Sequence, residues 1–359
     1  MTAPTTVVAA CAAFTADFPG HAAVVADTLS AAGFPVELHE NVESRFPDGE
    51  LCIDLPAEAA GRTVVLCQSV TGDHAPSDQA IMSLLAVARC YREHGAARIV
   101  AVIPHLAYAR HDRHVPGQRR PVMAALLADL AAAAGITELV TLASGAQDVL
   151  VGLFDGTGTR LTFLPVHEIH LEALVGLVGP DTVLVAPDGG AGEHVRMLAA
   201  ALGLPAVVAD KRRLGPERVD VTLHGGDDLG GLRHAVIVDD LITSAATVET
   251  VCAALRERAA DARIDVVATH LRLTAGGAER LARLRDRRTL HRVHTTDSGG
   301  RRPALDWLTS TPAVPRMARA LADRLAQDRA PARTLNARTP NGRTPNGRAP
   351  IDHALKDPV

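Results

Sequence analysis

Residues 235–247 read Ala-Val-Ile-Val-Asp-Asp-Leu-Ile-Thr-Ser-Ala-Ala-Thr, an apolar run followed by two acids and a loop of small and hydroxyl-bearing residues. The run Ala235–Val238 predicts a buried strand that delivers Asp239 and Asp240 to the edge of a sheet. A helix is expected to open at Thr247, and its first backbone N–H groups, unpaired within the helix and at the positive end of its dipole, suit a dianionic phosphate. The stretch therefore favours a site for a phosphorylated sugar, with the two carboxylates on vicinal ribose hydroxyls.

The loop residues support the same interpretation. Thr243, Ser244 and Thr247 add hydroxyl donors, and Ala245 and Ala246 keep the loop small enough for a ligand to approach closely. An alternative is that the acids after the strand only cap the following helix. We favour the phosphate site, because phosphate-binding loops are built as strand, small-residue loop and helix.

Short β-branched runs alternate with longer helical patterns along the chain, which predicts an α/β fold with mainly parallel sheets flanked by helices. Helices are expected from Ser77 to a stop at Gly95, over Val122–Ala134 and over Val314–Gln327. Strands are expected at Thr5–Ala9, Thr63–Gln68, Arg98–Pro104, Glu138–Leu142, Thr182–Ala186, Ala206–Ala209, His234–Asp239 and Ile264–Thr269.

A weak internal repeat indicates two similar domains. A strand, loop, helix and strand over residues 63–105 are echoed over residues 235–270, and only the second copy carries the phosphate loop. Coincidence between two ordinary strand–helix–strand units is the alternative. The predicted domains are residues 1–157 and 158–327. Residues 328–359, which contain a polar five-residue repeat rich in Pro, Asn and Gly, are expected to be a disordered tail.

Composition excludes several classes of function. The 359 residues are 47% hydrophobic with a net charge of −4, which is enough to bury a full core. No run approaches the roughly 20 apolar residues that cross a bilayer, and no basic and then hydrophobic segment opens the chain, so we expect a cytoplasmic protein without a membrane partner. Five scattered cysteines without a C-x-x-C pair argue against a disulfide framework and a zinc site. The balanced charge and 3% aromatic content give no support to nucleic-acid binding.

Residues 46–50, Phe-Pro-Asp-Gly-Glu, form a candidate base-binding turn. Phe46 offers a ring face for a purine, and Asp48 and Glu50 can accept hydrogen bonds from an adenine amino group. A simple Pro-Asp-Gly turn without a ligand is the alternative.

Three further motifs offer charges suited to a nucleotide. The segment from 105 to 120 concentrates cations that suit a triphosphate, namely Arg110, Arg113, Arg119, Arg120, His105, His111 and His114. A run of charges exposed to solvent, without a ligand, is the alternative. Residues 210–213, Asp-Lys-Arg-Arg, follow a predicted strand, and such cations neutralise charge at phosphorus during phosphoryl-type transfer. Asp188 at another strand tip presents a carboxylate that suits magnesium with several waters.

Taken in their order along the chain, these five motifs resemble those of the ribose-phosphate diphosphokinase family, which makes phosphoribosyl pyrophosphate. The resemblance spans roughly Val7 to Leu325. It implies two tandem phosphoribosyltransferase-type domains, Mg²⁺, ATP as the diphosphoryl donor and ribose 5-phosphate as the acceptor. It also implies an ATP-dependent diphosphotransferase that assembles as a homo-oligomer, usually a hexamer built from dimers.

The resemblance assigns roles to residues by motif. The hairpin with Phe46, Asp48 and Glu50 is placed against the nucleotide of a neighbouring subunit. Lys211 and Arg213 are expected to be catalytic, on a loop that closes over ATP. The other assignments are ATP binding by Arg110, His111 and Asp112, metal binding by Asp188, ribose binding by Asp239 and Asp240, and phosphate binding by Thr243, Ser244, Ala245, Ala246 and Thr247.

The chain departs from the family pattern at four places. His111 stands where glutamine is common, Thr243 where aspartate is usual and Ala246 where glycine is usual. The family also has a second metal ligand, a histidine, in the segment that corresponds to Thr141–Phe154, and no histidine occurs there. Ser144 takes that position, with Asp148 nearby as another possible substitute.

Two alternative functions follow from these departures. The threonine in the phosphate loop is compatible with a phosphoribosyltransferase that consumes phosphoribosyl pyrophosphate. The absent histidine is compatible with an inactive or weak paralogue that regulates an active synthetase. Because Lys211, Arg213 and Asp188 are all present, we favour an active diphosphokinase.

Overall fold

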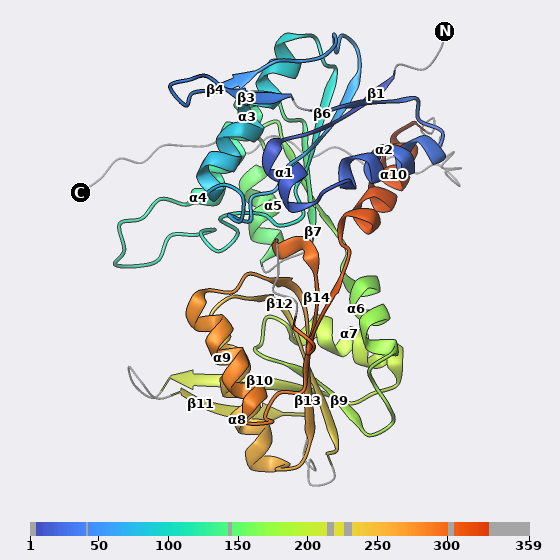
Figure 1. Cartoon of the computed structure of the whole chain (residues 1–359). Coiled ribbons are helices and arrows are strands. Elements are labelled where there is room, and N and C mark those ends of the chain that lie inside the picture. The colour runs from blue at the N-terminus through green and yellow to red at the C-terminus, as the bar shows by residue number, and fades with distance from the viewer. Residues whose placement is uncertain are drawn as a thin grey trace, which may run out of the picture.

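The computed structural model describes residues 5–40, 42–142, 146–213, 219–225, 232–300 and 305–329. Figure 1 shows two units of sheet and helices, one above the other. The predicted α/β fold with mainly parallel sheets flanked by helices is confirmed.

The first sheet has six parallel strands in the order β2-β1-β5-β6-β7-β8. Their bounds are Thr6–Ala10 (β1), Val36–His39 (β2), Thr63–Cys67 (β5), Arg98–Val102 (β6), Glu138–Leu142 (β7) and Arg160–Leu164 (β8). Alternate residues point to opposite faces, so Val7 and Val64 join one apolar core and Val8 and Val65 join the other. Helices α3 (Ser77–Glu93), α4 (Met123–Ala134) and α5 (Gln147–Phe154) contribute to the first core, and α2 (His21–Ala31) to the second; α1 (Ala12–Asp17) contributes to both.

The second sheet has the order β11-β10-β9-β12-β13-β14-β15 and is parallel except for β11, which pairs antiparallel with β10. The strands are Thr182–Ala186 (β9), Ala206–Arg213 (β10), Val219–His224 (β11), His234–Ile242 (β12), Arg263–Leu271 (β13), Arg292–Thr296 (β14) and Leu308–Thr311 (β15). Helices α8 (Ala246–Arg258) and α9 (Ala275–Asp286) cover one face, and α6 (His167–Val175) and α7 (Gly192–Leu202) cover the other.

The two repeated segments fold alike. β5, α3 and β6 form a strand–helix–strand unit with parallel strands, and so do β12, α8 and β13. The strands predicted from the sequence did not include β2, β8, β11, β14 and β15. They also did not include β3 (Glu43–Arg45) and β4 (Leu51–Ile53), the two strands of the hairpin that the resemblance implied around Phe46, Asp48 and Glu50. Several of these strands lie at sheet edges, where half-exposed residues lack the continuous apolar run of a central strand.

The predicted boundary between residues 157 and 158 does not match the two sheets. Strand β8, which follows that boundary, pairs with β7 and completes the first sheet. Helix α10 (Val314–Arg329) follows the last strand of the second sheet but returns to the first unit, where Figure 1 shows it beside α2. Its apolar face joins the core beneath α2, because a helix with one apolar stripe is stabilised by burying it.

Ion pairs fasten the end of α10 to the first sheet. The carboxylate of Glu138, 1% exposed, is 2.6 Å from Arg98 Nη2 and 3.4 Å from Arg324 Nε. Arg98 Nη1 lies 2.8 Å from Asp328. The prediction of a disordered tail from residue 328 is therefore wrong for residues 328 and 329, which are helical; residues 330–359 lie outside the described part of the chain.

The order of strands in the second sheet positions a site. β9 comes first in the chain, β10 lies on one side of it and β12 on the other. The chain leaves β9 through α7 on one face of the sheet and leaves β12 through α8 on the other, so a crevice forms at the carboxyl ends of β9 and β12. Ligands of open α/β sheets bind at such topological switch points. Within the described residues, no helix is long and apolar enough to cross a bilayer.

We expect the return of α10 to stabilise the first unit. Leu321 of α10 is 1% exposed in the core shared with α2, so Leu321→Ala should lower the free energy of unfolding by about 2–5 kcal/mol. Urea unfolding followed by circular dichroism measures this loss. Leu321→Met, which conserves volume, should cost less than about 1.5 kcal/mol. A loss below about 1 kcal/mol for Leu321→Ala would mean that α10 is not part of this core.

Candidate functional site at the switch point of the second sheet

The loop after β12 forms a small cradle at the start of α8. Ala245 has φ +55°, in the left-handed region, and its side chain is buried, so this turn is held by its surroundings at a local cost of about 1–2 kcal/mol. No side chain caps α8 from its N-cap position. A cavity of about 90 Å³ opens here, lined by residues 241–248 together with Asp239 and Arg110. The cradle has the small-residue turn and helix start expected of a phosphate site.

Asp239 and Asp240 lie on β12 beside this cradle. Asp239 Oδ1 accepts a hydrogen bond of 2.9 Å from the backbone N–H of Asp240. Burial, followed by the charge of Asp240, raises the pKa of Asp239 to about 7, and the charge of Asp188 acts in the same direction. Both carboxylates line a second cavity of about 470 Å³, which also contains Asp188 from the end of β9. The structure thus brings together three acids from two strands, as the switch point requires.

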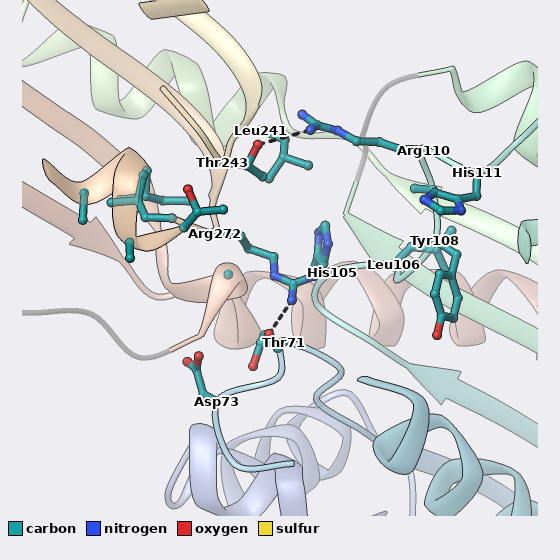
Figure 2. Close-up of a pocket in the computed structure, with 17 residues that line it drawn as sticks. Thr71, Asp73, His105, Leu106, Tyr108, Arg110, His111, Leu241, Thr243 and Arg272 are labelled. Carbon is teal, nitrogen blue, oxygen red and sulfur yellow. Dashed lines mark hydrogen bonds between the residues drawn. The ribbon is translucent and has the colours of Figure 1, made fainter. Parts of the chain in front are cut away.

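A third cavity, of about 610 Å³, lies between the two units (Figure 2). Tyr108, Arg110 and His111 enter it from the segment between β6 and α4 of the first unit, and Thr243 and Arg272 enter from the second. Tyr108 also has a left-handed φ of +61°, so strained backbone occurs at this cavity as well as in the cradle.

Direct contacts join the units across this cavity. Arg110 Nη1 donates a hydrogen bond of 3.2 Å to Thr243 Oγ1, and Arg272 donates to the backbone oxygen of Thr71 (Figure 2). His105 is packed edge-on against His270, with ring centroids 4.7 Å apart. Burial, then the charges of Arg272 and Arg110, lowers the pKa of His105 to about 3, so its ring is neutral at physiological pH.

The three cavities form one continuous region. Arg110 and Thr243 line both the interdomain cavity and the cradle, while Asp239 lines both the cradle and the acidic cavity. A ligand that fills the cradle therefore has room for a second group on either side. This arrangement fits two substrates that meet at the carboxyl ends of β9 and β12.

Other predicted site residues lie elsewhere in the chain. Asp112 is buried, receives two hydrogen bonds from Arg113, of 2.9 and 2.6 Å, and does not line the three cavities. The hydrogen bond from Arg113 is the first cause that lowers the pKa of Asp112. Phe46 is 51% exposed on the β3–β4 hairpin, whose turn contains Gly49 at φ +91° and also carries Asp48 and Glu50. This hairpin also lies outside the three cavities of its own chain.

Lys211 and Arg213 are not on a loop after a strand that ends at Ala209, as the sequence predicted. β10 continues to Arg213, and its residues pair with β11, Lys211 opposite Val221 and Arg213 opposite Val219. The reason is that β11, absent from the sequence-based prediction, supplies backbone hydrogen-bond partners to this segment. Both positions therefore lie on a two-stranded arm at the edge of the second sheet (Figure 1).

Comparison with known proteins identifies the family. Residues 18–135 match the family model described as the N-terminal domain of ribose phosphate pyrophosphokinase. The ribose-phosphate pyrophosphokinase of Vibrio vulnificus is 32% identical over 266 residues, which cover 73% of this chain and 80% of that protein. The enzyme of the same name from Halalkalibacterium halodurans is 32% identical over 80% of this chain and 86% of its own. The chain belongs to the ribose-phosphate pyrophosphokinase family.

The solved structures agree on the fold. The crystal structure of phosphoribosylpyrophosphate synthetase from Mycobacterium smegmatis matches with a TM-score of 0.73 and 24% identity, over 90% of this chain and 99% of that one. The predicted family is therefore confirmed, under its other name of ribose-phosphate diphosphokinase. The site residues carried over from the family motifs stay predictions, to which the geometry above gives positions.

The metal site of this family member is only partly described. Asp188 is exposed at the start of the β9–α7 turn, and its Oδ1 accepts a hydrogen bond of 3.2 Å from Ala191 N–H. Ser144 lies outside the described residues, and Asp148 in α5 does not line the acidic cavity. Within the described ranges, no three His, Cys, Asp or Glu side chains are close enough to enclose a metal ion.

Among the residues that line these cavities, His170, His194 and Arg272 were not candidates from the sequence, whereas His105 was named with the cations of residues 105–120. Each of the three lies alone within or beside an ordinary helix or strand, and nothing in its sequence neighbourhood marks it as functional. Their positions come only from the packing of the two units and of α6 against α7.

The raised pKa of Asp239 predicts a pH-dependent stability. Between about pH 4 and pH 7 the folded chain holds a proton that the unfolded chain has released, so the free energy of unfolding falls as pH rises through this range. Asp239→Asn removes this penalty and should stabilise the ligand-free protein by about 1–3 kcal/mol at pH 8, with a much smaller gain at pH 4.5.

Urea unfolding in EDTA at the two pH values measures this difference. Asp261→Asn, at an exposed turn residue, is the matched control and should change the stability little at either pH. An equal effect of Asp239→Asn at pH 4.5 and pH 8 would show that its carboxyl does not titrate in this range.

Proposed function

We propose that the chain is an ATP-dependent diphosphotransferase that converts ribose 5-phosphate and Mg-ATP to phosphoribosyl pyrophosphate and AMP. Membership of the ribose-phosphate pyrophosphokinase family gives the reaction class. The single structural observation that supports it most is the Arg110–Thr243 hydrogen bond of 3.2 Å. It joins the segment expected to hold ATP to the loop expected to hold the sugar phosphate.

The sugar phosphate fits the cradle and the acidic cavity. In this proposal the backbone N–H groups at the start of α8 and the side chains of Thr243, Ser244 and Thr247 bind the 5-phosphate. Asp239 and Asp240 then accept hydrogen bonds from the ribose hydroxyls, because they lie on the strand that leads directly into the cradle. Thr243 and Ala246 differ from the residues usual in the family, but they are compatible with this arrangement. Thr243 offers a hydroxyl, and Ala246 begins the helix.

The nucleotide fits the interdomain cavity. Arg110 and His111 line it, and Arg110 is positioned to meet phosphate oxygens beside Thr243. Asp112 would act indirectly, by holding Arg113 through its two hydrogen bonds. We assign Phe46, Asp48 and Glu50 to the adenine of a neighbouring subunit, because their hairpin does not line the three cavities of the candidate site in its own chain. A homo-oligomer and a cytoplasmic location are part of this proposal.

The transfer step needs positive charge near the attacked phosphorus. Lys211 and Arg213 are proposed to supply it from the β10–β11 arm, at the edge of the same sheet as the cradle. Mg²⁺ would offset charge on the diphosphoryl oxygens when bound, and Asp188 would hold it through one carboxylate with several waters. The anomeric hydroxyl attacks the β-phosphorus in line, and AMP leaves.

No comparison favours either alternative function. The relatives named above are ribose-phosphate pyrophosphokinases, and they match most of this chain. We therefore do not adopt the alternative hypotheses that the chain is a phosphoribosyltransferase or an inactive regulatory paralogue.

The direct test is AMP formation by the purified full-length chain with ATP, Mg²⁺ and ribose 5-phosphate, with the sugar product identified by mass spectrometry. We expect AMP release that depends on the sugar, together with an equal amount of phosphoribosyl pyrophosphate. Ribose without its phosphate is the control and should give little AMP. Binding of ribose 5-phosphate without AMP release would contradict the proposal and favour a regulatory subunit.

Lys211→Ala should separate catalysis from binding. We expect kcat to fall by about 10²–10³-fold, because a charge-stabilising contact in the transition state is lost, while the Kd for ribose 5-phosphate changes little. Arg212 is a neighbouring cation to which the family motif assigns no catalytic role, so Arg212→Ala is the matched control and should retain most activity. Equal losses of kcat and of sugar-phosphate affinity would refute a catalytic role for Lys211.

A further inference from the structure

We propose that His194 is a ligand of the divalent cation that Asp188 is expected to hold, in place of the histidine that the segment Thr141–Phe154 lacks. The inference deepens the proposed function and rests on it only for the expectation of a cation at Asp188. It concerns a residue of α7, outside the family motifs found in the sequence.

Asp188 and His194 lie at the two ends of one short turn. β9 ends at Ala186, Asp188 follows it, and α7 begins at Gly192 with His194 as its third residue. Asp188 Oδ1 accepts a hydrogen bond from Ala191 N–H, which fixes the carboxylate against the start of α7. Both side chains line the acidic cavity of about 470 Å³. The imidazole and the carboxylate are thus carried by one rigid junction.

A second layer of hydrogen bonds orients the His194 ring. His194 Nε2 is 2.8 Å from His170 Nδ1, and His170 Nε2 is 2.9 Å from Thr269 Oγ1. When His170 donates from Nε2 to the threonine, its Nδ1 accepts the N–H of His194 Nε2. This leaves the Nδ1 lone pair of His194 available. Metal-binding histidines characteristically donate their other ring N–H to such a partner, which fixes the tautomer.

The His170 ring that orients His194 is itself held in place. It is 2% exposed and has a hydrogen-bond partner at each ring nitrogen. An imidazole binds a metal through a ring nitrogen that carries no proton.

The charge of the cavity favours a cation. Asp188, Asp239 and Asp240 all line it, and its described lining contains no Arg or Lys. Three carboxylates that line one cavity repel one another. A divalent ion bound by Asp188 would relieve this repulsion.

The position of the missing histidine points to the same cavity. Ala146 and Gln147, from the segment that carries the histidine in the family, line this cavity, and neither offers an imidazole. His194 reaches the cavity from α7 instead. Because no three potential ligands converge among the described residues, the protein would supply two ligands, and waters and substrate oxygens the rest, which is a usual arrangement for Mg²⁺ and Mn²⁺ sites.

Pulsed EPR of Mn²⁺ bound to the full-length protein tests this assignment. Mn²⁺ replaces Mg²⁺ as the probe, and nucleotide is left out so that purine nitrogens contribute no signal. We expect the wild-type protein to show ¹⁴N coupling from a directly bound imidazole. His194→Ala should lose this coupling and bind Mn²⁺ about 10-fold more weakly, and Asp188→Asn should also weaken Mn²⁺ binding.

Two controls make the result specific. His94→Ala removes an exposed imidazole at the end of α3, in the other unit and outside the cavity lining, and it should leave both coupling and affinity unchanged. His194→Gln keeps the size and polarity of the side chain, and with circular dichroism it shows whether a loss comes from misfolding. Coupling that persists in His194→Ala, or wild-type Mn²⁺ binding without ¹⁴N coupling, would overturn the proposal.

These outcomes are separate from those of the proposed function. AMP formation from ATP and ribose 5-phosphate without imidazole coupling would refute the role of His194 and leave the diphosphokinase in place. Imidazole coupling that depends on His194, in a protein that forms no AMP, would refute the diphosphokinase and leave the ligand assignment.

Discussion

The candidate site depends on a single constraint, the passage of the chain from β9 and from the neighbouring β12 to opposite faces of the sheet. Because α7 follows β9 on one face and α8 follows β12 on the other, the two connections diverge and leave a crevice at the carboxyl ends of these strands. Asp188 and the Asp239–Asp240 pair meet there, and the start of α8 closes one end of the crevice. The remaining features, namely the first unit, the β10–β11 arm and the histidines of α6 and α7, surround this crevice.

The site combines charge repulsion with local backbone strain. Burial of Asp239 and the neighbouring charge of Asp240 raise the pKa of Asp239, and left-handed Ala245 and Tyr108 store strain in the cradle and at the interdomain cavity. Such costs persist only where the surrounding structure fixes them, and they are common at functional sites. Here the rigid surroundings are two complete sheets, each covered by helices on both faces.

The interface between the two units is part of the site rather than a simple linker. Arg110 contacts Thr243, and Arg272 contacts the Thr71 carbonyl, so each unit holds a loop of the other. Helix α10 adds a connection of another kind, because the end of the chain crosses back from the second sheet to the core of the first. The relative placement of the two proposed substrates is therefore fixed by contacts that are distant in sequence.

The sequence by itself determined the fold class, the central strands and the residues of the phosphate cradle, because these depend on local patterns. A continuous apolar run such as Ala235–Val238 specifies a buried strand wherever it occurs, and the acids and hydroxyls after it follow from chain order. Edge strands such as β11 and β15 escaped prediction, since their half-exposed residues carry a weaker signal. The tertiary structure alone decided that β8 and α10 belong to the first unit and that Asp112 is held by Arg113 away from the cavities. It alone placed His194 in the lining of the same cavity as Asp239 and Asp240, because α7 and β12 pack together in a way that no local sequence pattern encodes.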